Sequence, residues 1–446
     1  MSEHAFFGTD GIRDRAGEGR LSPDNVRRVG RALASFAKGR LGASPRFFVG
    51  RDTRPSGPDL LRQVAEGLGA EGISLQDGGI LPTPAVAWGT AVGACDVGIV
   101  LTASHNPPED NGIKVFLDGG RKTSPEEEAD LDARIRAADP RGGTPRVVAR
   151  PEAVDRYVEG AVRDASAGGR LDGLRLVVDC ANGATTRTAR RILEALGAIV
   201  ETPVGSDPAG AINDACGTQH VEPWREAVRA ARAHGGLAFD GDGDRVLLAD
   251  ASGEVLDGDP LLYLLGRDFA DRGLLHGRLV VATVMSNFGL ETALAAHGIR
   301  LERAPVGDRH VAARMRETGA SLGGEQSGHV VLERAGALLG DGVLAGVEAL
   351  QAARRRGVDL AAVRREVPRC PQVLKNVRVA RKVPLEDAPR FLACVADEER
   401  ALAGRGRVVV RYSGTEPLLR IMVEGPDEPT VHAAIARLES AVSLIL

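Results

Sequence analysis

Paired cysteines of the kind that bind zinc or carry out dithiol chemistry are missing from this 446-residue sequence. Its five cysteines are widely scattered and form no C-x-x-C pair, which argues against a zinc ribbon or a thioredoxin-like site. We therefore expect reduced, mostly buried thiols, as in a protein of the cytoplasm.

Long apolar runs are missing as well. No stretch approaches the roughly 20 apolar residues that a membrane-spanning helix needs, and the first residues lack the basic and apolar segments of a secretion signal. The net charge is only −4, with both signs mixed along the chain, which does not favour nucleic acid or a membrane surface as a partner. The sequence thus predicts a soluble, cytoplasmic protein with neither kind of partner.

The chain is too long for one compact core, because single cores stop growing at roughly 250–300 residues. Short apolar runs that suggest strands alternate with helical patterns in three successive blocks. The expected strands lie at 46–50, 72–76 and 97–101, at 174–179 and 199–202, and at 278–284 and 299–303. This alternation indicates α/β units with largely parallel central strands.

The pattern changes after Arg365. Expected strands at 373–379, 407–410 and 418–424, followed by a helix from Pro429, indicate a small α+β domain. The sequence therefore predicts four domains, three of them α/β and the last α+β. Their expected limits are 1–150, 151–256, 257–366 and 367–446.

Ser104 follows the expected strand 97–101 directly, in the loop Thr102–Pro107. Loops at strand ends are where α/β proteins place ligands, so this serine is a candidate nucleophile with His105 beside it. The loop has neither Gly-x-Ser-x-Gly nor Ser-x-x-Lys, since position 107 is proline. From this loop alone, a turn or helix N-cap serine is the favoured interpretation.

The loop Asp240–Arg245 places three aspartates, Asp240, Asp242 and Asp244, at alternate positions between two apolar stretches. Three neighbouring carboxylates repel one another unless a cation neutralises them, and hard oxygen ligands select Mg²⁺ or Ca²⁺. An EF-hand is excluded because Arg245 stands where its glycine is required. A solvated acidic turn is the alternative. Arg245 beside the acids suits a phosphate next to a metal.

Two further glycine-rich loops follow apolar strands. Gly323–His329 offers Glu, Ser and His groups that suit sugar hydroxyls, although a locally bonded turn explains it equally well. Arg411–Pro417 combines an arginine with two hydroxyls and Gly414, as a phosphate-binding loop would. A plain β-turn remains open there, and the chain contains no Walker motif.

These four loops, in this order and at this spacing, resemble those of the α-D-phosphohexomutase superfamily over essentially the whole chain. Within it the sequence is most similar to the bacterial phosphoglucosamine mutase branch. The segments that carry this similarity are Phe7–Arg13, Asp179–Thr185, Val284–Asn287, Val306–Arg309 and Gly324–His329. Gln326 is typical of this branch, whereas the phosphomannomutase/phosphoglucomutase branch usually has Met. Tyr412 and His310 depart from it, where Pro and Tyr are usual.

The resemblance implies a four-domain fold and interconversion of glucosamine 6-phosphate and glucosamine 1-phosphate through a phosphoserine and a 1,6-bisphosphate, which serves as intermediate or primer. Ser104 would be the phosphoserine, and one Mg²⁺ per subunit would be bound by Ser104, Asp240, Asp242 and Asp244. Arg13, His105, Lys114 and Arg245 would complete the catalytic set. The substrate-binding set would be Glu325, Ser327, His329, Arg411, Ser413, Gly414, Thr415 and Arg420.

The resemblance also allows a homodimer, as in many relatives. It leaves two other functions open. The first is the sister activity, phosphoglucomutase or phosphomannomutase, which uses the same machinery on another sugar. The second is a non-catalytic sugar-phosphate binding protein, although such a protein has no reason to keep Ser104 and the three aspartates.

Overall fold

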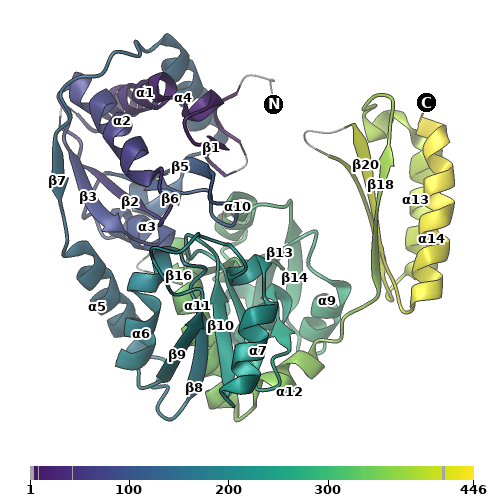
Figure 1. Cartoon of the computed structure of the whole chain (residues 1–446). Helices are drawn as coiled ribbons and strands as arrows, with labels where there is room; N and C mark the ends of the chain where they lie inside the picture. Colours follow the sequence, from purple (N-terminus) through teal and green to yellow (C-terminus); the bar gives the residue numbers. More distant parts are fainter. Residues whose placement is uncertain (1–4, 9, 43, 335, 414–416, 446) are drawn as a thin grey trace.

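The computed structural model describes residues 5–8, 10–42, 44–334, 336–413 and 417–445, and shows four β-sheets that follow one another along the chain (Figure 1). The first three sheets carry helices as α/β units, and the last is a small α+β unit. The fold class predicted from the sequence is therefore confirmed.

The first sheet has the strand order β1-β5-β4-β2-β3-β7, with β6 paired to β5. Its strands are β1 (Ile12–Arg15), β2 (Phe47–Arg51), β3 (Leu75–Ile80), β4 (Val97–Leu101), β5 (Asp110–Leu117), β6 (Arg121–Lys122) and β7 (Val147–Ala149). The helices of this part are α1 (Pro23–Leu41), α2 (Gly57–Ala70), α3 (Thr83–Ala91) and α4 (Pro125–Ala137). Strands β2, β3 and β4 are parallel, so the loops after β2 and β4 meet at one edge of the sheet.

One expected strand of this sheet was displaced. A strand was predicted at 72–76, and the structure places it later, as β3 from Leu75 to Ile80. The amides of Glu71 and Gly72 bond to carbonyls of the last turn of α2, and Gly72 has a φ of 75°. These residues therefore end the helix instead of starting the strand.

The second sheet has the order β12-β11-β10-β8-β9, and the third has the order β14-β13-β15-β16-β17. The second consists of β8 (Arg175–Asp179), β9 (Ile199–Val204), β10 (Gly235–Phe239), β11 (Val246–Asp250) and β12 (Val255–Leu256), with helices α5 (Ala153–Ser166), α6 (Ala189–Ala195) and α7 (Glu222–Ala230). The third consists of β13 (Leu279–Thr283), β14 (Arg300–Ala304), β15 (Leu322–Gly324), β16 (Val330–Arg334) and β17 (Ala337–Gly340), with helices α8 (Gly258–Asp271), α9 (Phe288–Ala295), α10 (Asp308–Thr318), α11 (Gly342–Arg356) and α12 (Leu360–Glu366).

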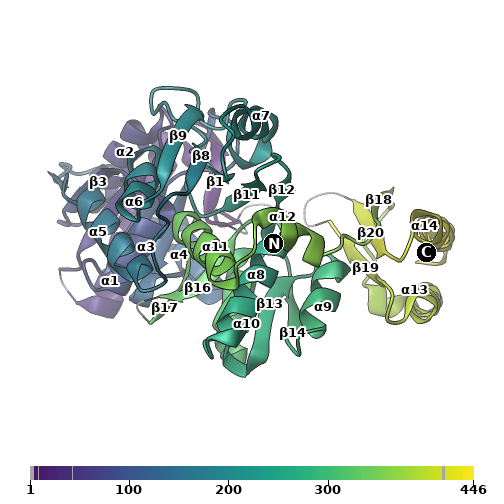
Figure 2. The same cartoon turned by 90° about the horizontal axis from the view of Figure 1, so that it is seen from below.

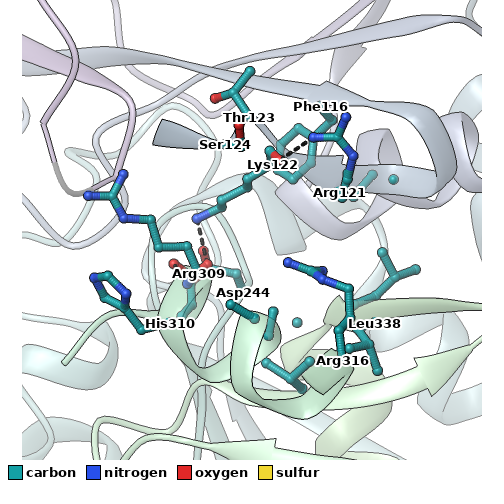
Figure 3. Close-up of a pocket in the computed structure, with 18 of the residues that line it drawn as sticks. Phe116, Arg121, Lys122, Thr123, Ser124, Asp244, Arg309, His310, Arg316 and Leu338 are labelled. Carbon is teal, nitrogen blue, oxygen red and sulfur yellow. Dashed lines mark hydrogen bonds and ion pairs between the residues drawn. The ribbon is translucent and has the colours of Figure 1, made fainter. Parts of the chain in front are cut away.

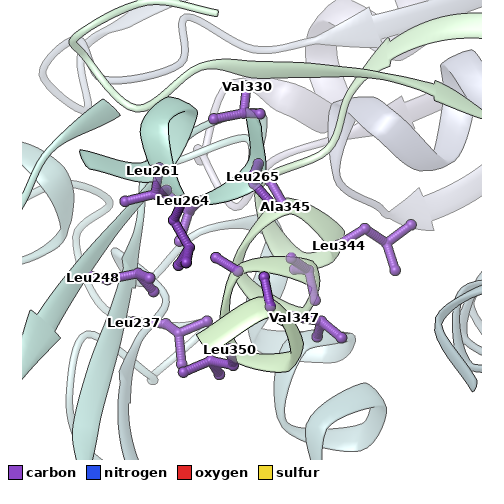
Figure 4. Packing of buried hydrophobic residues seen from close by; sticks show 14 of the residues in the cluster. Leu237, Leu248, Leu261, Leu264, Leu265, Val330, Leu344, Ala345, Val347 and Leu350 are labelled. Atoms are coloured by element: carbon purple, nitrogen blue, oxygen red, sulfur yellow. The ribbon is translucent and has the colours of Figure 1, made fainter. Parts of the chain in front are cut away.

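Helix α11 joins these two sheets into one core. It follows the third sheet in sequence, yet Val347 and Leu350 lie in the same buried cluster as Leu237 of β10 and Leu248 of β11 (Figure 4). Leu261 of α8 belongs to that cluster too. Because buried apolar contacts are the main stabilising contribution, the loops at the ends of both sheets are held in a fixed relation.

The last sheet, β18-β20-β19, has its own core and stands to one side of the other three (Figures 1 and 2). It consists of β18 (Gln372–Arg378), β19 (Arg407–Tyr412) and β20 (Leu418–Glu424), and α13 (Pro389–Leu402) and α14 (Glu428–Ala441) cover the face turned away from the rest of the molecule. Polar bonds anchor it, because Arg407 donates to the carbonyl of Ser286 at 2.6 Å and Asn287 donates to Glu424 at 3.1 Å.

Among the residues that the structure describes, none of the helices combines the length and the apolar character that crossing a bilayer requires.

Candidate active site

The three aspartates of the acidic loop converge on one point. The loop connects β10 to β11, which form an antiparallel hairpin, and Gly243 has a φ of 73° that lets the chain curl. One carboxylate oxygen each from Asp240, Asp242 and Asp244 lies within 4.8 Å of the others, and all three residues are buried. A buried all-oxygen cluster of this kind suits a hard divalent cation.

The acidic loop still has free acceptor capacity. The Oδ1 atom of Asp242 is buried and accepts no hydrogen bond from any described residue, whereas Oδ1 of Asp244 lies 3.4 Å from Nδ1 of His329. Burial, followed by the charges of Asp244 and Asp242, raises the pKa of Asp240 well above its ordinary value. Buried carboxylate oxygens without donors are costly, so the loop fits a bound cation.

Ser104 lies against this loop, as the resemblance implies. Its Oγ donates to Oδ2 of Asp240 at 2.6 Å and lies 3.3 Å from Nδ1 of His105. The residue has a φ of 54°, a left-handed conformation that is uncommon for serine and frequent at functional sites. Burial, and then the charges of Arg245 and Arg13, lower the pKa of His105 to about 4, so its ring is neutral near pH 7.

Two cations of the first sheet lie beside the site. Lys114, on β5, is buried, and its Nζ is 2.8 Å from Oδ2 of Asp242 and 3.1 Å from Oδ2 of Asp244. Arg13, on the neighbouring strand β1, donates to the side-chain oxygen of Asn106 at 3.2 Å and pairs with Asp10. Lys114 therefore partly neutralises the acidic loop.

Arg245 is anchored to the same loop. Its backbone amide donates to Oδ1 of Asp240 at 3.1 Å, and its buried Nε lies 4.0 Å from Oδ1 of Asp244 and donates no hydrogen bond to a described residue. The guanidinium thus lies beside the aspartates and has an N–H group that can donate to an anion.

His329 of the third sheet closes the acidic loop from the other side. Its Nδ1 is 3.4 Å from Asp244, and its Nε2 is 3.6 Å from Asp308. Burial favours the neutral ring, but Asp244 and Asp308 outweigh it and raise the pKa of His329 to about 9. The structure therefore places His329 as a charged partner of the acidic loop.

The rest of the third-sheet loop faces different ways. Glu325 is buried and accepts from the backbone amide of Gly307 at 2.9 Å, whereas Ser327 is exposed. The side-chain amide of Gln326 donates to Asp259 at the start of α8, at 3.1 Å. The side chain of Gln326 is thus bonded to α8 of the third unit, so it would influence a ligand through the shape of the loop.

The basic groups of the last sheet also gather. Arg411 on β19 is the cross-strand partner of Arg420 on β20, and burial together with Arg420 lowers the pKa of Arg411. The hydroxyl of Ser413 accepts from Arg420 at 3.4 Å, and its carbonyl accepts from Lys382 at 2.7 Å. Sequence reasoning missed Lys382. Gly414 and Thr415 lie outside the described residues.

A cavity of about 410 Å³ adjoins the acidic loop between the first and third units (Figure 3). Asp244 and His329 line it, together with Arg121 and Lys122 of β6 and Arg309 of α10. Lys122 bridges Asp10 and Asp308 at 2.5 Å each. No local sequence pattern indicates these pairs, which join the two units beside the site.

Comparison with known proteins agrees with this geometry. Models of the phosphoglucomutase/phosphomannomutase family match the chain in four parts: alpha/beta/alpha domain I at residues 4–141, domain II at 155–253, domain III at 257–370 and the C-terminal domain at 374–441. The chain belongs to this family. Its residues Ser104 and Asp240–Arg245 fall within the matches to domains I and II.

Curated relatives match this chain over nearly their whole lengths. A phosphoglucosamine mutase of Cereibacter sphaeroides is 43% identical, and the alignment covers 98% of both chains. A phosphoglucosamine mutase of Symbiobacterium thermophilum is also 43% identical, over 99% of this chain and 98% of the relative.

Solved structures share the fold. A phosphoglucomutase/phosphomannomutase family protein of Burkholderia thailandensis superposes with a TM-score of 0.81 at 26% identity, covering 100% of this chain and 98% of the other. An N-acetylphosphoglucosamine mutase of Aspergillus fumigatus, solved with GlcNAc-6P and magnesium, gives a TM-score of 0.65 at 18% identity, over 98% and 95% of the two chains. At that identity the second comparison supports the fold alone.

Proposed function

We propose that this protein is a phosphoglucosamine mutase that interconverts glucosamine 6-phosphate and glucosamine 1-phosphate. The observation that carries the proposal is the hydroxyl of Ser104, which lies 2.6 Å from Asp240 within a buried cluster of three carboxylates. Curated relatives of that name, 42–43% identical over nearly the whole chain, support the same activity.

The proposed reaction consists of two phosphoryl transfers. In the first, the C1 hydroxyl oxygen of glucosamine 6-phosphate loses its proton and bonds to the phosphorus of phosphorylated Ser104, while the bond from that phosphorus to Oγ breaks and Oγ gains a proton, giving glucosamine 1,6-bisphosphate. In the second, Oγ of Ser104 loses its proton and bonds to the phosphorus of the C6 phosphate, while the bond from that phosphorus to the C6 oxygen breaks and this oxygen gains a proton, giving glucosamine 1-phosphate and phosphorylated Ser104. The neutral ring of His105 lies within reach of the proton that Ser104 then gives up.

The residues of the site have separate tasks in this scheme. Phosphoryl transfer mainly needs positioning and neutralisation of charge. Arg245 and Arg13 would hold the moving phosphoryl group, while Lys114 holds the carboxylates of Asp242 and Asp244 in place. Because the two phosphates of the bisphosphate exchange places, Arg411, Ser413 and Arg420, with Gly414 and Thr415, would hold whichever phosphate is not reacting.

Magnesium is the cation that we propose for the acidic loop. Asp240, Asp242 and Asp244 would hold it together with a phosphate oxygen on Ser104, and the donor-free Oδ1 of Asp242 fits such an ion. When bound, it would supply Lewis-acid stabilisation of the charge on the phosphoryl group. The resemblance supports one ion per subunit.

Sugar recognition is assigned to the third unit. Glu325, Ser327 and His329 would face the hydroxyls or the amine of the sugar, although His329 in this structure pairs with Asp244. Gln326 would affect the preference for one sugar over another only indirectly, through its bond to Asp259.

We also propose a cytoplasmic location, a sugar 1,6-bisphosphate as primer and assembly as a homodimer. The proposed domain limits, after residues 150, 256 and 366, fall between helices and strands.

A primed turnover assay tests the reaction type. Purified protein is treated with glucose 1,6-bisphosphate and Mg²⁺ and then given glucosamine 6-phosphate, and ³¹P NMR follows the products. Formation of glucosamine 1-phosphate without inorganic phosphate supports the mutase. Release of inorganic phosphate as the main product would indicate a phosphatase, and the absence of any turnover would favour a binding protein; either result contradicts the proposal.

A further inference from the structure

The Ser104 loop is held by two side chains from different units that end on the same two carbonyls. Nη2 of Arg54, in the loop after β2, donates to the carbonyl of Ser104 at 3.1 Å and to that of Asn106 at 2.8 Å. Nδ2 of Asn213, from the second unit, donates to the same carbonyls at 2.8 and 2.9 Å. Each carbonyl therefore has both of its acceptor positions filled.

Arg54 is tied into the interior by further bonds. It is 1% exposed, and it also donates to the carbonyls of Pro107 and Asp110 and to the carboxylate of Asp52 at 2.9 Å. Asp52 in turn accepts the hydroxyl of Thr102 at 2.6 Å, and that hydroxyl accepts the backbone amide of Ser104 at 2.8 Å. Both peptide groups of Ser104 are thus bonded to one buried network.

This network offsets an unfavourable backbone conformation. Ser104 has a φ of 54°, and a left-handed conformation is unfavourable for a residue with a side chain. Such a conformation persists only where its surroundings determine it strongly. Arg54 and Asn213 donate to the backbone of the loop, whereas Oγ of Ser104 donates to Asp240.

We propose that Arg54 and Asn213 are positioning residues that together hold Ser104 in the orientation for phosphoryl transfer and lock its loop to the unit that carries the acidic loop. Neither residue touches the reacting atoms. Each acts through the backbone of Ser104, and the catalytic part of the proposal rests on the proposed mutase function.

Asn213→Gly tests this assignment most cleanly. Asn213 has a φ of 59°, and glycine keeps that backbone while removing both donors. Asn182→Gly is the matched control, because Asn182 is another left-handed asparagine of the second unit, with a φ of 52°, whose side chain bonds only within its own unit. Arg54→Lys is the companion variant, since it keeps the charge beside Asp52 but loses the planar donor set.

The first readout is steady-state kinetics. A displacement of about 1 Å can lower a rate about 100-fold, so we expect Asn213→Gly and Arg54→Lys to lower kcat about 10- to 100-fold with little change in KM. Their combined effect should be smaller than the product of the two, because both act on the same carbonyls. If Asn213→Gly differs less than about twofold in kcat from Asn182→Gly, a change too small to reflect misplaced reacting groups, the proposal is overturned.

The second readout does not depend on turnover. Hydrogen exchange of the amides at 103–111 should be faster in Asn213→Gly than in Asn182→Gly. Equal exchange in the two variants would overturn the proposed positioning role of Asn213. If the wild-type protein lacks mutase activity, the proposed function fails. The positioning of the Ser104 loop by Arg54 and Asn213 is then judged by hydrogen exchange alone. Failure of the proposed function and failure of the positioning role can therefore be told apart.

Discussion

Nζ of Lys114 lies 2.8 Å from Oδ2 of Asp242, and both groups are almost completely buried. The same ammonium reaches Asp244 at 3.1 Å and Asp10 at 3.2 Å. Burial disfavours a charged lysine, but Asp10, Asp242 and Asp244 outweigh it and raise the pKa of Lys114 well above its ordinary value. Lys114 is therefore one of the positive charges within the protein that offset the charge of the acidic loop.

Replacing Lys114 by methionine should destabilise the metal-free protein by about 3–5 kcal/mol, because it leaves buried carboxylates without their counter-charge. Mg²⁺ binds the folded state and so stabilises it. It should stabilise Lys114→Met more than the wild type, because it replaces the missing counter-charge, and so restore part of this loss. Thermal unfolding in EDTA and in excess Mg²⁺ measures both effects. Lys375→Met, at an exposed ion pair with Glu439, is the control. An equal magnesium-induced shift in wild type and Lys114→Met would contradict the role of Lys114.

Replacing Ser104 by alanine should lower mutase turnover at least about 1,000-fold, because the group that carries the phosphoryl is removed. The fold should remain, since only the side-chain bonds to Asp240 and His105 are lost. Kinetics and circular dichroism test this together, with Ser166→Ala, at an exposed serine of α5, as control. Turnover near the wild-type level would exclude Ser104 as the phosphoryl carrier.

Replacing Asp242 by asparagine should weaken magnesium binding and activity together. Even residues beyond the ligands change metal affinity by about 10- to 100-fold when mutated, so loss of a ligand charge should cost at least as much. Titration calorimetry with Mg²⁺ measures the affinity, and Asp214→Asn, at an exposed aspartate of the second unit, is the control. Unchanged affinity would remove Asp242 from the metal site.

The cysteines should differ in reactivity. Cys95, Cys180 and Cys216 are buried, and burial raises the pKa of each to about 12, whereas Cys370 and Cys394 are partly exposed. Because the thiolate is the reactive form, a thiol reagent at pH 8 should label the last two first and the other three only after unfolding. Rapid labelling of Cys180 in the native protein would contradict this burial.

The sequence predicted the elements that have sharp local signals. Strands 97–101 and 418–424 were predicted with the bounds that the structure shows, because each is an apolar run bounded by turn residues. The convergence of the three aspartates followed from their alternate spacing and their glycines. In these cases a few neighbouring residues determine the local structure.

The missed features depend on contacts between distant residues. Arg54 lies 50 positions from Ser104, and its bonds to backbone carbonyls leave no local pattern. A signal did exist, since Asp52 and Arg54 follow β2 as Ser104 follows β4. Likewise, nothing in the sequence of α11 indicates that it packs against the second sheet as well as the third, because an apolar helix face does not specify its partner.

A comparison of substrates tests the central claim most directly. The primed protein is given glucosamine 6-phosphate, glucose 1-phosphate or mannose 1-phosphate at equal concentration with Mg²⁺, and kcat/KM is measured for each. The account predicts a clear preference for the glucosamine substrate, which Ser104→Ala abolishes. A preference for glucose or mannose phosphate would contradict the assignment of the sugar, and turnover that survives in Ser104→Ala would contradict the mechanism itself.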